Sequence, residues 1–157
     1  EVGLPDVRLA ARAMQAGVEV LKPHLGRAGA PPAGRVVLGT VQGDLHDIGK
    51  NLVGILLRGA GWEVIDLGTD VPAARFLEAA ESSGARVIGL SALLTTTMPR
   101  MGEVVSLLRE RGLSGRVKVI VGGAPVTQAF ADEIGADGWG FDADSAVRRV
   151  KALVGSA

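Results

Sequence analysis

Cysteine is absent from this chain of 157 residues, and aromatic side chains make up only 3% of it. Without cysteine the protein can form no disulfide framework, no thiolate nucleophile and no cysteine-ligated metal site. An excess of either charge is missing too, because 17 basic residues balance 17 acidic residues. No run of Lys or Arg concentrates positive charge, so we expect neither a nucleic-acid partner nor attraction to an anionic membrane.

Long apolar runs are also missing. The longest apolar stretches are too short and too often interrupted to cross a bilayer. No charged-then-apolar segment resembles a signal peptide. We therefore expect a cytoplasmic protein with no membrane partner, and the 47% of apolar residues are enough to form the core of one ordinary domain.

Glycine and aliphatic residues are abundant, and they recur in a regular alternation. Short apolar runs, typical of strands buried on both faces of a parallel sheet, lie at Arg35–Thr40, Trp62–Leu67, Arg86–Leu90, Lys118–Val121 and, more weakly, Gly138–Gly140. Amphipathic stretches between and after them predict helices at Gly49–Gly59, Ala73–Ser83, Pro99–Arg111, Val126–Ile134 and Asp142–Leu153. This alternation predicts an α/β fold with right-handed crossovers, a flavodoxin-like doubly wound five-stranded parallel sheet of order 2-1-3-4-5.

The first part of the chain departs from this pattern. Its apolar residues step by three and four from Leu4 to Leu21, which predicts one amphipathic helix that ends at Pro23. The next segment is rich in Gly, Ala and Pro and is interpreted as a linker. We therefore divide the chain into an N-terminal helix at 1–23, a linker at 24–34 and an α/β domain at 35–157.

The predicted topology indicates where a ligand would bind. In an open parallel sheet, ligands bind at the carboxyl ends of the strands, where the strand order reverses. In this order that point lies between the first and third strands, which are followed by Val41–Gly49 and Ser91–Thr97. The first segment holds one of only two histidines, and the second is rich in hydroxyl groups.

Two common nucleotide motifs do not fit the first segment. The spacing from Gly43 to Gly49 is one residue longer than in a phosphate-binding P-loop, and Asn51 replaces the magnesium-binding hydroxyl. The carboxylates at 44 and 47 would repel phosphate. No G-x-G-x-x-G follows the first strand, so the fingerprint of a dinucleotide site is missing as well.

The pattern that remains is Asp44-x-His46-x-x-Gly49. A carboxylate two residues before a loop histidine can hold one ring nitrogen, which fixes the tautomer and raises the basicity of the other nitrogen. Ligands for a structural zinc are too few, so a metal at His46 would bring most of its own ligands. Alternatively, His46 only caps the next helix or bonds to Asp47, and the hydroxyl groups after the third strand cap the helix that follows them.

Residues Gly43–Asn51 (GDLHDIGKN) resemble the signature of B12-binding (corrinoid) domains of the methyltransferase class. Such domains occur in cobalamin-dependent methionine synthase and in the small corrinoid proteins of methanol, methylamine and methoxyarene methyltransferase systems. Trp62–Pro72, Ile88–Thr95 and Val121–Ala124 are similar to further segments of the family in the same order. The resemblance covers nearly the whole α/β part.

The resemblance implies a cobamide cofactor, which is cobalamin or a variant with another lower base, and therefore cobalt. His46 would be the axial ligand to cobalt in place of the cofactor's own base (base-off/His-on), and Asp44 would bind the far nitrogen of its ring. Thr97 stands where the family has a serine that completes this relay. The residues expected to bind the cofactor are Gly43, Asp44, Leu45, His46, Asp47, Ile48, Gly49, Ser91, Leu93, Thr95, Thr97, Gly122, Gly123 and Ala124.

The displaced nucleotide tail of the cofactor would lie in a groove between the sheet and the flanking helices. Gly49, Gly122 and Gly123 would line this groove, because the absence of a side chain lets the tail approach the backbone. Ala136–Asp142 would contact the far end of the tail. Members of the methyltransferase class also carry a four-helix module before the α/β domain, and we expect Leu4–Leu21 to be its last helix.

The function implied is a non-catalytic corrinoid carrier that shuttles a methyl group between partner methyltransferases. One partner would be a methyl-donor:corrinoid methyltransferase, and the other a corrinoid:methyl-acceptor methyltransferase with an acceptor of the tetrahydrofolate or thiol type. The alternatives are the B12-binding subunit of an adenosylcobalamin-dependent mutase and a B12-sensing module. Residues 47–51 favour the methyltransferase form over the mutase, and no DNA-binding domain is evident for a sensor.

Overall fold

The computed structural model describes residues 33–154, which form a five-stranded parallel sheet with the order β2-β1-β3-β4-β5. The strands are β1 (Arg35–Thr40), β2 (Glu63–Asp66), β3 (Val87–Ser91), β4 (Lys118–Gly122) and β5 (Gly138–Gly140). The helices are α2 (Ile48–Gly59), α3 (Ala73–Ser83), α4 (Pro99–Glu110), α5 (Gln128–Ile134) and α6 (Ala143–Val154). The flavodoxin-like fold and its strand order are confirmed, whereas the predicted N-terminal helix and nearly all of the linker lie outside the described residues.

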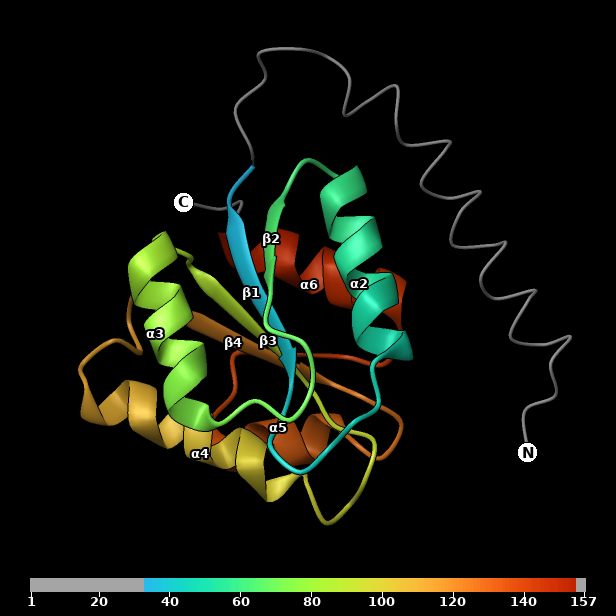
Figure 1. The fold of residues 1–157 in the computed structure, drawn as a ribbon, viewed down its shortest axis with the longest axis vertical. Coiled ribbons are helices and arrows are strands. Elements are labelled where there is room, and N and C mark those ends of the chain that lie inside the picture. Colours follow the sequence, from blue (N-terminus) through green and yellow to red (C-terminus); the bar gives the residue numbers. More distant parts are fainter. Residues whose placement is uncertain (1–32, 155–157) are drawn as a thin grey trace, which may run out of the picture.

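Helices cover both faces of the sheet (Figure 1). Successive side chains of a strand point to opposite faces, so each strand contributes to two apolar cores. Val37, Ile88 and Val119 pack on the side of α3, α4 and α5. Val36, Leu38, Val87 and Ile120 pack on the side of α2 and α6. Strands buried on both sides explain the continuous apolar runs of the sequence.

The ends of several elements differ from the prediction by one or two residues. β2 is shorter than Trp62–Leu67, while β3 and β4 continue to Ser91 and Gly122, which pair with each other. α5 begins at Gln128 rather than Val126 because Thr127 is extended and its hydroxyl accepts a hydrogen bond from Phe130 N at 3.1 Å. None of the described helices is long and apolar enough to cross a membrane.

Candidate functional site

Two loops meet at the carboxyl ends of β1 and β3. The pairing of these strands brings Thr40 opposite Ser91, and Val41 N donates a hydrogen bond to Ser91 O at 3.0 Å. The β1–α2 loop (residues 41–47) therefore lies beside the β3–α4 loop (residues 92–98). This is the edge of the sheet at which the strand order predicts a ligand.

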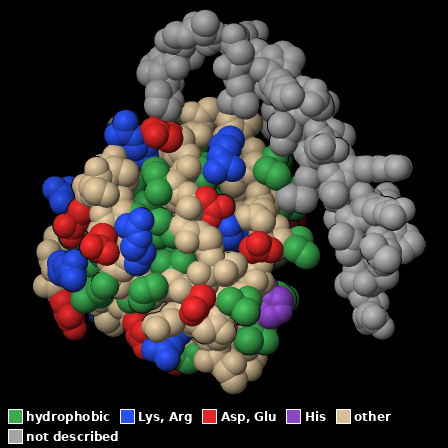
Figure 2. Space-filling model, viewed as in Figure 1, with side chains coloured by type: hydrophobic (Ala, Val, Ile, Leu, Met, Phe, Trp, Pro, Cys, Tyr) green, Lys and Arg blue, Asp and Glu red, His purple; other side chains and the backbone are tan. Residues whose placement is uncertain are grey.

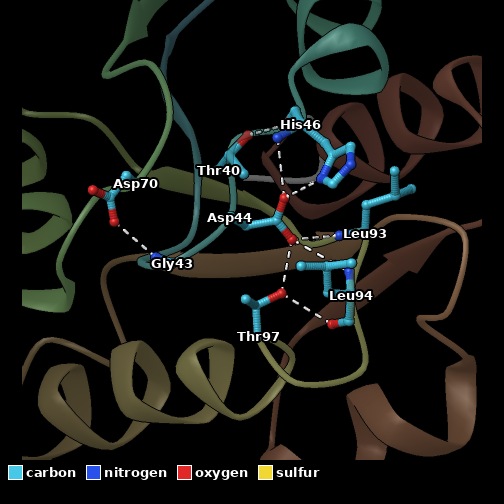
Figure 3. Close-up of polar contacts among 8 residues, drawn as sticks. All are labelled: Thr40, Gly43, Asp44, His46, Asp70, Leu93, Leu94 and Thr97. Atoms are coloured by element: carbon cyan, nitrogen blue, oxygen red, sulfur yellow. Dashed lines mark hydrogen bonds and ion pairs between the residues drawn. The ribbon is translucent and has the colours of Figure 1, made fainter.

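Asp44 joins these two loops (Figure 3). One of its oxygens, Oδ1, lies 2.7 Å from His46 Nδ1 and accepts a hydrogen bond from His46 N at 3.1 Å. The other, Oδ2, accepts hydrogen bonds from the Thr97 hydroxyl at 2.7 Å and from Leu93 N at 2.8 Å. The Asp44 side chain is fully buried, whereas half of the His46 side chain is exposed. The structure thus links a buried carboxylate to an accessible imidazole.

Asp44 is held in its ionised form. Burial alone raises the pKa of this carboxyl group, but the hydrogen bonds from Leu93 N, the Thr97 hydroxyl and His46 outweigh burial and keep the pKa well below its usual range. An ionised carboxylate can only accept hydrogen bonds, so His46 Nδ1 carries the proton in this contact. The lone pair of the neutral ring then lies on Nε2, which has no hydrogen-bond partner among the described residues.

The simpler roles considered for these residues do not fit the geometry. The ring of His46 contacts Asp44 and not Asp47, and α2 receives no side-chain cap. α4 likewise begins without one: its N-cap residue is Met98, and the hydroxyl of Thr97 contacts Asp44 and Leu94 O instead. The Asp-x-His pair and Thr97 therefore form one connected relay rather than separate helix caps.

Sequence analysis missed two residues that hold this loop. The hydroxyl of Thr40, which is fully buried at the end of β1, donates a hydrogen bond to His46 O at 2.7 Å. Asp70, in the loop between β2 and α3, accepts a hydrogen bond from Gly43 N at 2.7 Å. A threonine ending an otherwise apolar strand was a possible signal for the first contact. The second depends on strand pairing, and no local pattern marks it.

A cavity of about 610 Å³ opens beside His46 and extends between the sheet and helices α2 and α6. Ten of the predicted residues line it: Leu45, His46, Asp47, Ile48, Gly49, Ser91, Leu93, Gly122, Gly123 and Ala124. Four of the predicted residues do not. Asp44 and Thr97 lie behind His46, while Gly43 and Thr95 are exposed on the two loops outside the cavity.

The inner part of the cavity is apolar. Leu38, Gly89 and Ile120 lie side by side on β1, β3 and β4 and line it on the sheet side. Val53 of α2 and Val150 of α6 line it on the helix side. Gly89, in the middle of this row, leaves room for the side chain of Leu38, because a Cβ on Gly89 would lie 2.4 Å from Leu38 Cδ2.

The three predicted glycines serve different purposes. A Cβ on Gly123, whose φ is +128°, would lie 1.9 Å from Ala92 O, so the backbone itself requires glycine there. A Cβ on Gly122 would lie 3.1 Å from Gly140 O, which is also tight. A Cβ on Gly49 would meet no atom within 4 Å, so only a ligand in the cavity would give a reason for glycine at this position.

The mouth of the cavity is surrounded by exposed apolar side chains. The large apolar residues that the described part of the chain exposes are Leu45, Ile48, Leu93, Leu94 and Phe141. Leu45 and Ile48, which lie one residue before and two residues after His46, are 73% and 70% exposed. Figure 2 shows apolar side chains gathered around the histidine. A large flat ligand above His46 would cover them.

Within residues 33–154, Lys50 is the one Lys or Arg side chain that lines the cavity, and an acidic side chain balances its charge. Its buried ammonium contacts Asp66 Oδ1 and Oδ2 at 2.7 and 2.8 Å and Asn51 Oδ1 at 2.7 Å. Burial alone raises the pKa of Asp66. The hydrogen bonds from Lys50 and Gly68 N and the positive charge of Lys50 outweigh burial, so the pKa of Asp66 is lowered overall. Lys50 is thus committed to Asp66, which agrees with the rejection of a P-loop.

The residues present fit a metal that arrives inside its own macrocycle. Residues 33–154 contain no group of three His, Cys, Asp or Glu side chains that could hold an ion by themselves. One imidazole nitrogen, an apolar mouth and a deep apolar groove match a corrin ring that needs one axial ligand and room for a nucleotide tail.

Comparison with known proteins agrees with this fit. Residues 34–148 match the family model of the B12 binding domain. The chain is 48% identical over 158 residues to a corrinoid protein of Desulfitobacterium hafniense, covering 99% of this chain and 73% of that protein. It is 51% identical over 152 residues to dimethylamine corrinoid protein 2 of Methanosarcina mazei, covering 96% of this chain and 71% of that protein.

A solved structure shares the fold as well. The methanol:cobalamin methyltransferase complex MtaBC of Methanosarcina barkeri contains a chain that superposes with a TM-score of 0.76 at 36% identity, covering 99% of this chain and 59% of that chain. The protein therefore belongs to the B12-binding domain family and, within it, to the small corrinoid proteins. Its cofactor is a cobamide, which contains cobalt.

Proposed function

We propose that this protein is a cytoplasmic corrinoid carrier that holds its cobamide base-off/His-on and passes a methyl group between partner methyltransferases. The observation that carries the proposal is the buried Asp44 carboxylate, which fixes Nδ1 of His46 and leaves Nε2 free at the cavity. When bound, the cobalt of the cobamide supplies the chemistry of methyl transfer, and the protein supplies binding, orientation and tuning of the axial ligand.

His46 is the axial ligand to cobalt in this proposal. Asp44 fixes the tautomer of the ring and raises the basicity of Nε2, and Thr97 orients Asp44 from behind. Thr97 keeps the hydroxyl of the family's serine, so its contact at 2.7 Å supports the same relay despite the different residue.

The remaining predicted residues surround the cofactor. The loops at the carboxyl ends of β1, β3 and β4 would hold the corrin ring, and the apolar groove between the sheet and helices α2 and α6 would hold the nucleotide tail. The residues proposed to contact the ring and the entrance of the groove are Gly43, Leu45, Asp47, Ile48, Ser91, Leu93, Thr95 and Ala124. Gly49, Gly122 and Gly123 border the tail.

The partners are two methyltransferases, one that loads the corrinoid from a methyl donor and one that unloads it to a tetrahydrofolate-type or thiol acceptor. The similarity to a methanol:cobalamin methyltransferase complex and to a dimethylamine corrinoid protein supports partners of this class. In this proposal the protein itself is a non-catalytic subunit of the system, since the reactivity belongs to the cofactor and the turnover to the partner methyltransferases.

The spectrum of the bound cofactor in its Co(II) state tests this proposal. With histidine labelled by nitrogen-15, a His46–cobalt bond changes the nitrogen superhyperfine splitting in the EPR spectrum. His46→Ala should remove this splitting, while His24→Ala, which changes the only other histidine, should keep it. The assignment would be contradicted if labelling the histidines left the splitting of the wild-type protein unchanged, or if His46→Ala gave the same spectrum as the wild type. A native cofactor with an adenosyl upper ligand would favour the mutase or sensor instead.

A further inference from the structure

The loop between β2 and α3 (residues 67–72) runs along the β1–α2 loop that carries His46. Thr40 N donates a hydrogen bond to Gly68 O at 2.9 Å, and Val71 N donates one to Thr40 O at 3.0 Å. Val41 and Val71 form an isolated parallel bridge. The two loops therefore continue the pairing of β1 with β2 beyond the ends of the strands.

Asp70 forms the tightest part of this contact. Its Oδ1 accepts a hydrogen bond from Gly43 N at 2.7 Å, and its own N donates one to Asp44 O at 3.0 Å. Figure 3 shows Asp70 reaching Gly43 from the side opposite the Asp44 relay. Asp70 thus fixes the two residues that precede Leu45 and His46.

The backbone of Asp70 adopts an unfavourable conformation to make these contacts. Its φ is +54°, and it is the one residue other than glycine with a positive φ within residues 33–154. Glycine would adopt this left-handed conformation at lower cost, so the conformation alone does not call for Asp. The carboxylate, which binds Gly43 N, gives a reason for Asp at this position. Strained residues of this kind cluster where a site must be held in place.

The other end of the histidine loop is also tied to this segment. Asp66, the last residue of β2, binds Lys50 in the first turn of α2. Asp66 Oδ1 also accepts a hydrogen bond from Gly68 N at 2.8 Å, which joins the ion pair to the β2–α3 loop. His46 therefore lies between two anchored points, Lys50 on one side and Gly43 on the other.

We propose that the β2–α3 loop is a clamp that sets the position of His46, and that Asp70 is its positioning residue. The proposal rests on His46 being the cobalt ligand. Asp70 is not among the residues that line the cavity. Its hydrogen bonds go to Gly43 and Asp44, and it acts through these two residues. Loss of its carboxylate removes the hydrogen bond to Gly43 N and loosens this end of the loop, while the Lys50 end stays anchored, so the imidazole is held less firmly above the groove.

Three substitutions separate the carboxylate of Asp70 from its backbone conformation. Asp70→Asn keeps an acceptor oxygen and a residue that tolerates the left-handed region. Asp70→Ala removes the acceptor and keeps the conformational cost, whereas Asp70→Gly removes the acceptor and relieves that cost. Asp132→Ala is the matched control, because it deletes an exposed carboxylate of α5 that accepts one side-chain hydrogen bond, from Gln128 at 2.9 Å.

Two measurements on the full chain decide the proposal. Amide hydrogen exchange of Gly43 without cofactor reports the clamp, and it should be at least roughly tenfold faster in Asp70→Ala and Asp70→Gly. Affinity for cob(II)alamin reports its consequence and should weaken about tenfold in the same two variants, as for other partners that orient a metal ligand. Asp70→Asn and Asp132→Ala should stay within about twofold of the wild type in both measurements.

The Asp70→Gly variant excludes a merely structural role. Its melting temperature without cofactor should not lie below that of Asp70→Ala, because the backbone strain is gone, yet its affinity should be equally weak. Wild-type affinity in Asp70→Gly, or a loss in Asp70→Asn as large as in Asp70→Ala, would overturn the proposal. If labelled histidine shows no cobalt bond in the wild type, the proposed function fails, while Gly43 exchange still decides whether Asp70 holds the loop.

Discussion

Asp44 is the residue on which the polar contacts of the site converge. It binds His46 through one oxygen and residues of the β3–α4 loop through the other. Because the carboxylate is fully buried, each of these donors replaces a water molecule that the charge would otherwise need. Changes at any of its partners should therefore affect both the stability of the protein and the binding of its cofactor.

Thr97→Val tests the hydroxyl of the relay with almost no change of volume. We expect the substitution to cost about 1–3 kcal/mol of unfolding free energy, because a buried carboxylate loses a hydrogen bond. It should also weaken cob(II)alamin binding roughly tenfold or more. Denaturant unfolding and a binding titration measure the two effects. Thr97→Ser, which keeps the hydroxyl, is the control, and a Val variant that behaves like it would show that the hydroxyl is dispensable.

The stability of the cofactor-free protein should fall in acid. The pKa values of Asp44 and Asp66 are lowered in the folded protein, whereas the unfolded chain has ordinary Asp values of about 3.9. The stabilisation from these carboxylates is therefore complete above about pH 5 and is lost progressively as the pH falls below about 4 toward the folded-state pKa values. Urea unfolding between pH 7 and pH 2.5 measures this loss.

A variant without the Asp44 carboxylate provides the comparison for the pH series. Asp44→Asn should be less stable than the wild type at pH 7, and its unfolding free energy should fall less steeply below pH 4. Parallel pH curves for the two proteins would mean that Asp44 does not contribute to the acid sensitivity.

How much of the site the sequence predicts depends on the distance between the residues along the chain. The pair Asp44 and His46 is local, so its spacing alone indicates the contact. Thr97 was placed only through a family resemblance, because 53 residues separate it from Asp44. The contact of Gly43 with Asp70 spans 27 residues and depends on how β1 pairs with β2. No pattern in either segment predicts this contact.

At the scale of elements, helix α2 connects the histidine loop to the groove. It begins at Ile48 without a side-chain cap, and its second residue is Gly49. Its inner surface and that of α6 close the apolar groove. The first turn of this helix therefore forms part of the cavity wall and also affects the stability of the helix.

Gly49→Ala should separate these two demands. The new methyl group meets no protein atom within 4 Å, so alanine should stabilise the cofactor-free helix by about 0.5–1 kcal/mol. The same methyl group enters the wall of the cavity, where crowding against the cofactor costs about 1–3 kcal/mol. Thermal unfolding and cob(II)alamin affinity should therefore change in opposite directions.

Gly54→Ala is the control for that experiment. It lies on the same helix but does not line the cavity, and its Cβ would make ordinary contact with Leu38 at 3.5 Å. It should stabilise the protein without weakening the affinity for cob(II)alamin. Unchanged affinity in Gly49→Ala would mean that the tail does not approach this part of α2.

The alternation of apolar and amphipathic segments predicted every described strand and helix, because strands buried on both faces have a plain signature. The ends were harder to predict. Ser91 and Gly122 belong to strands although their residue types favour loops, and their mutual pairing in the sheet decides this. Sequence patterns also assigned Gly123 to the cofactor, whereas the close approach to Ala92 O would require glycine without any ligand.

At the scale of the whole molecule, a carrier should not turn over by itself. We expect no steady methyl transfer from methanol, methylamines or methoxyarenes when the loaded protein is assayed alone. Gas chromatography of the products, or the visible spectrum of the cofactor over time, measures this. Sustained turnover of any of these donors without an added methyltransferase would refute the carrier function.

The uncovered leucine, isoleucine and phenylalanine side chains around the cavity have a consequence for the life of the protein before loading. Leu45, Ile48 and Phe141 are 67–73% exposed, and a bound cofactor would cover them, the two loop residues with its corrin ring and Phe141 with its nucleotide tail. Exposed apolar side chains gathered around one cavity promote self-association. We therefore expect the solubility of the newly made chain to depend on vitamin supply: cells grown without cobamide should accumulate it in aggregates, and light scattering of the purified protein should fall as cob(II)alamin is added.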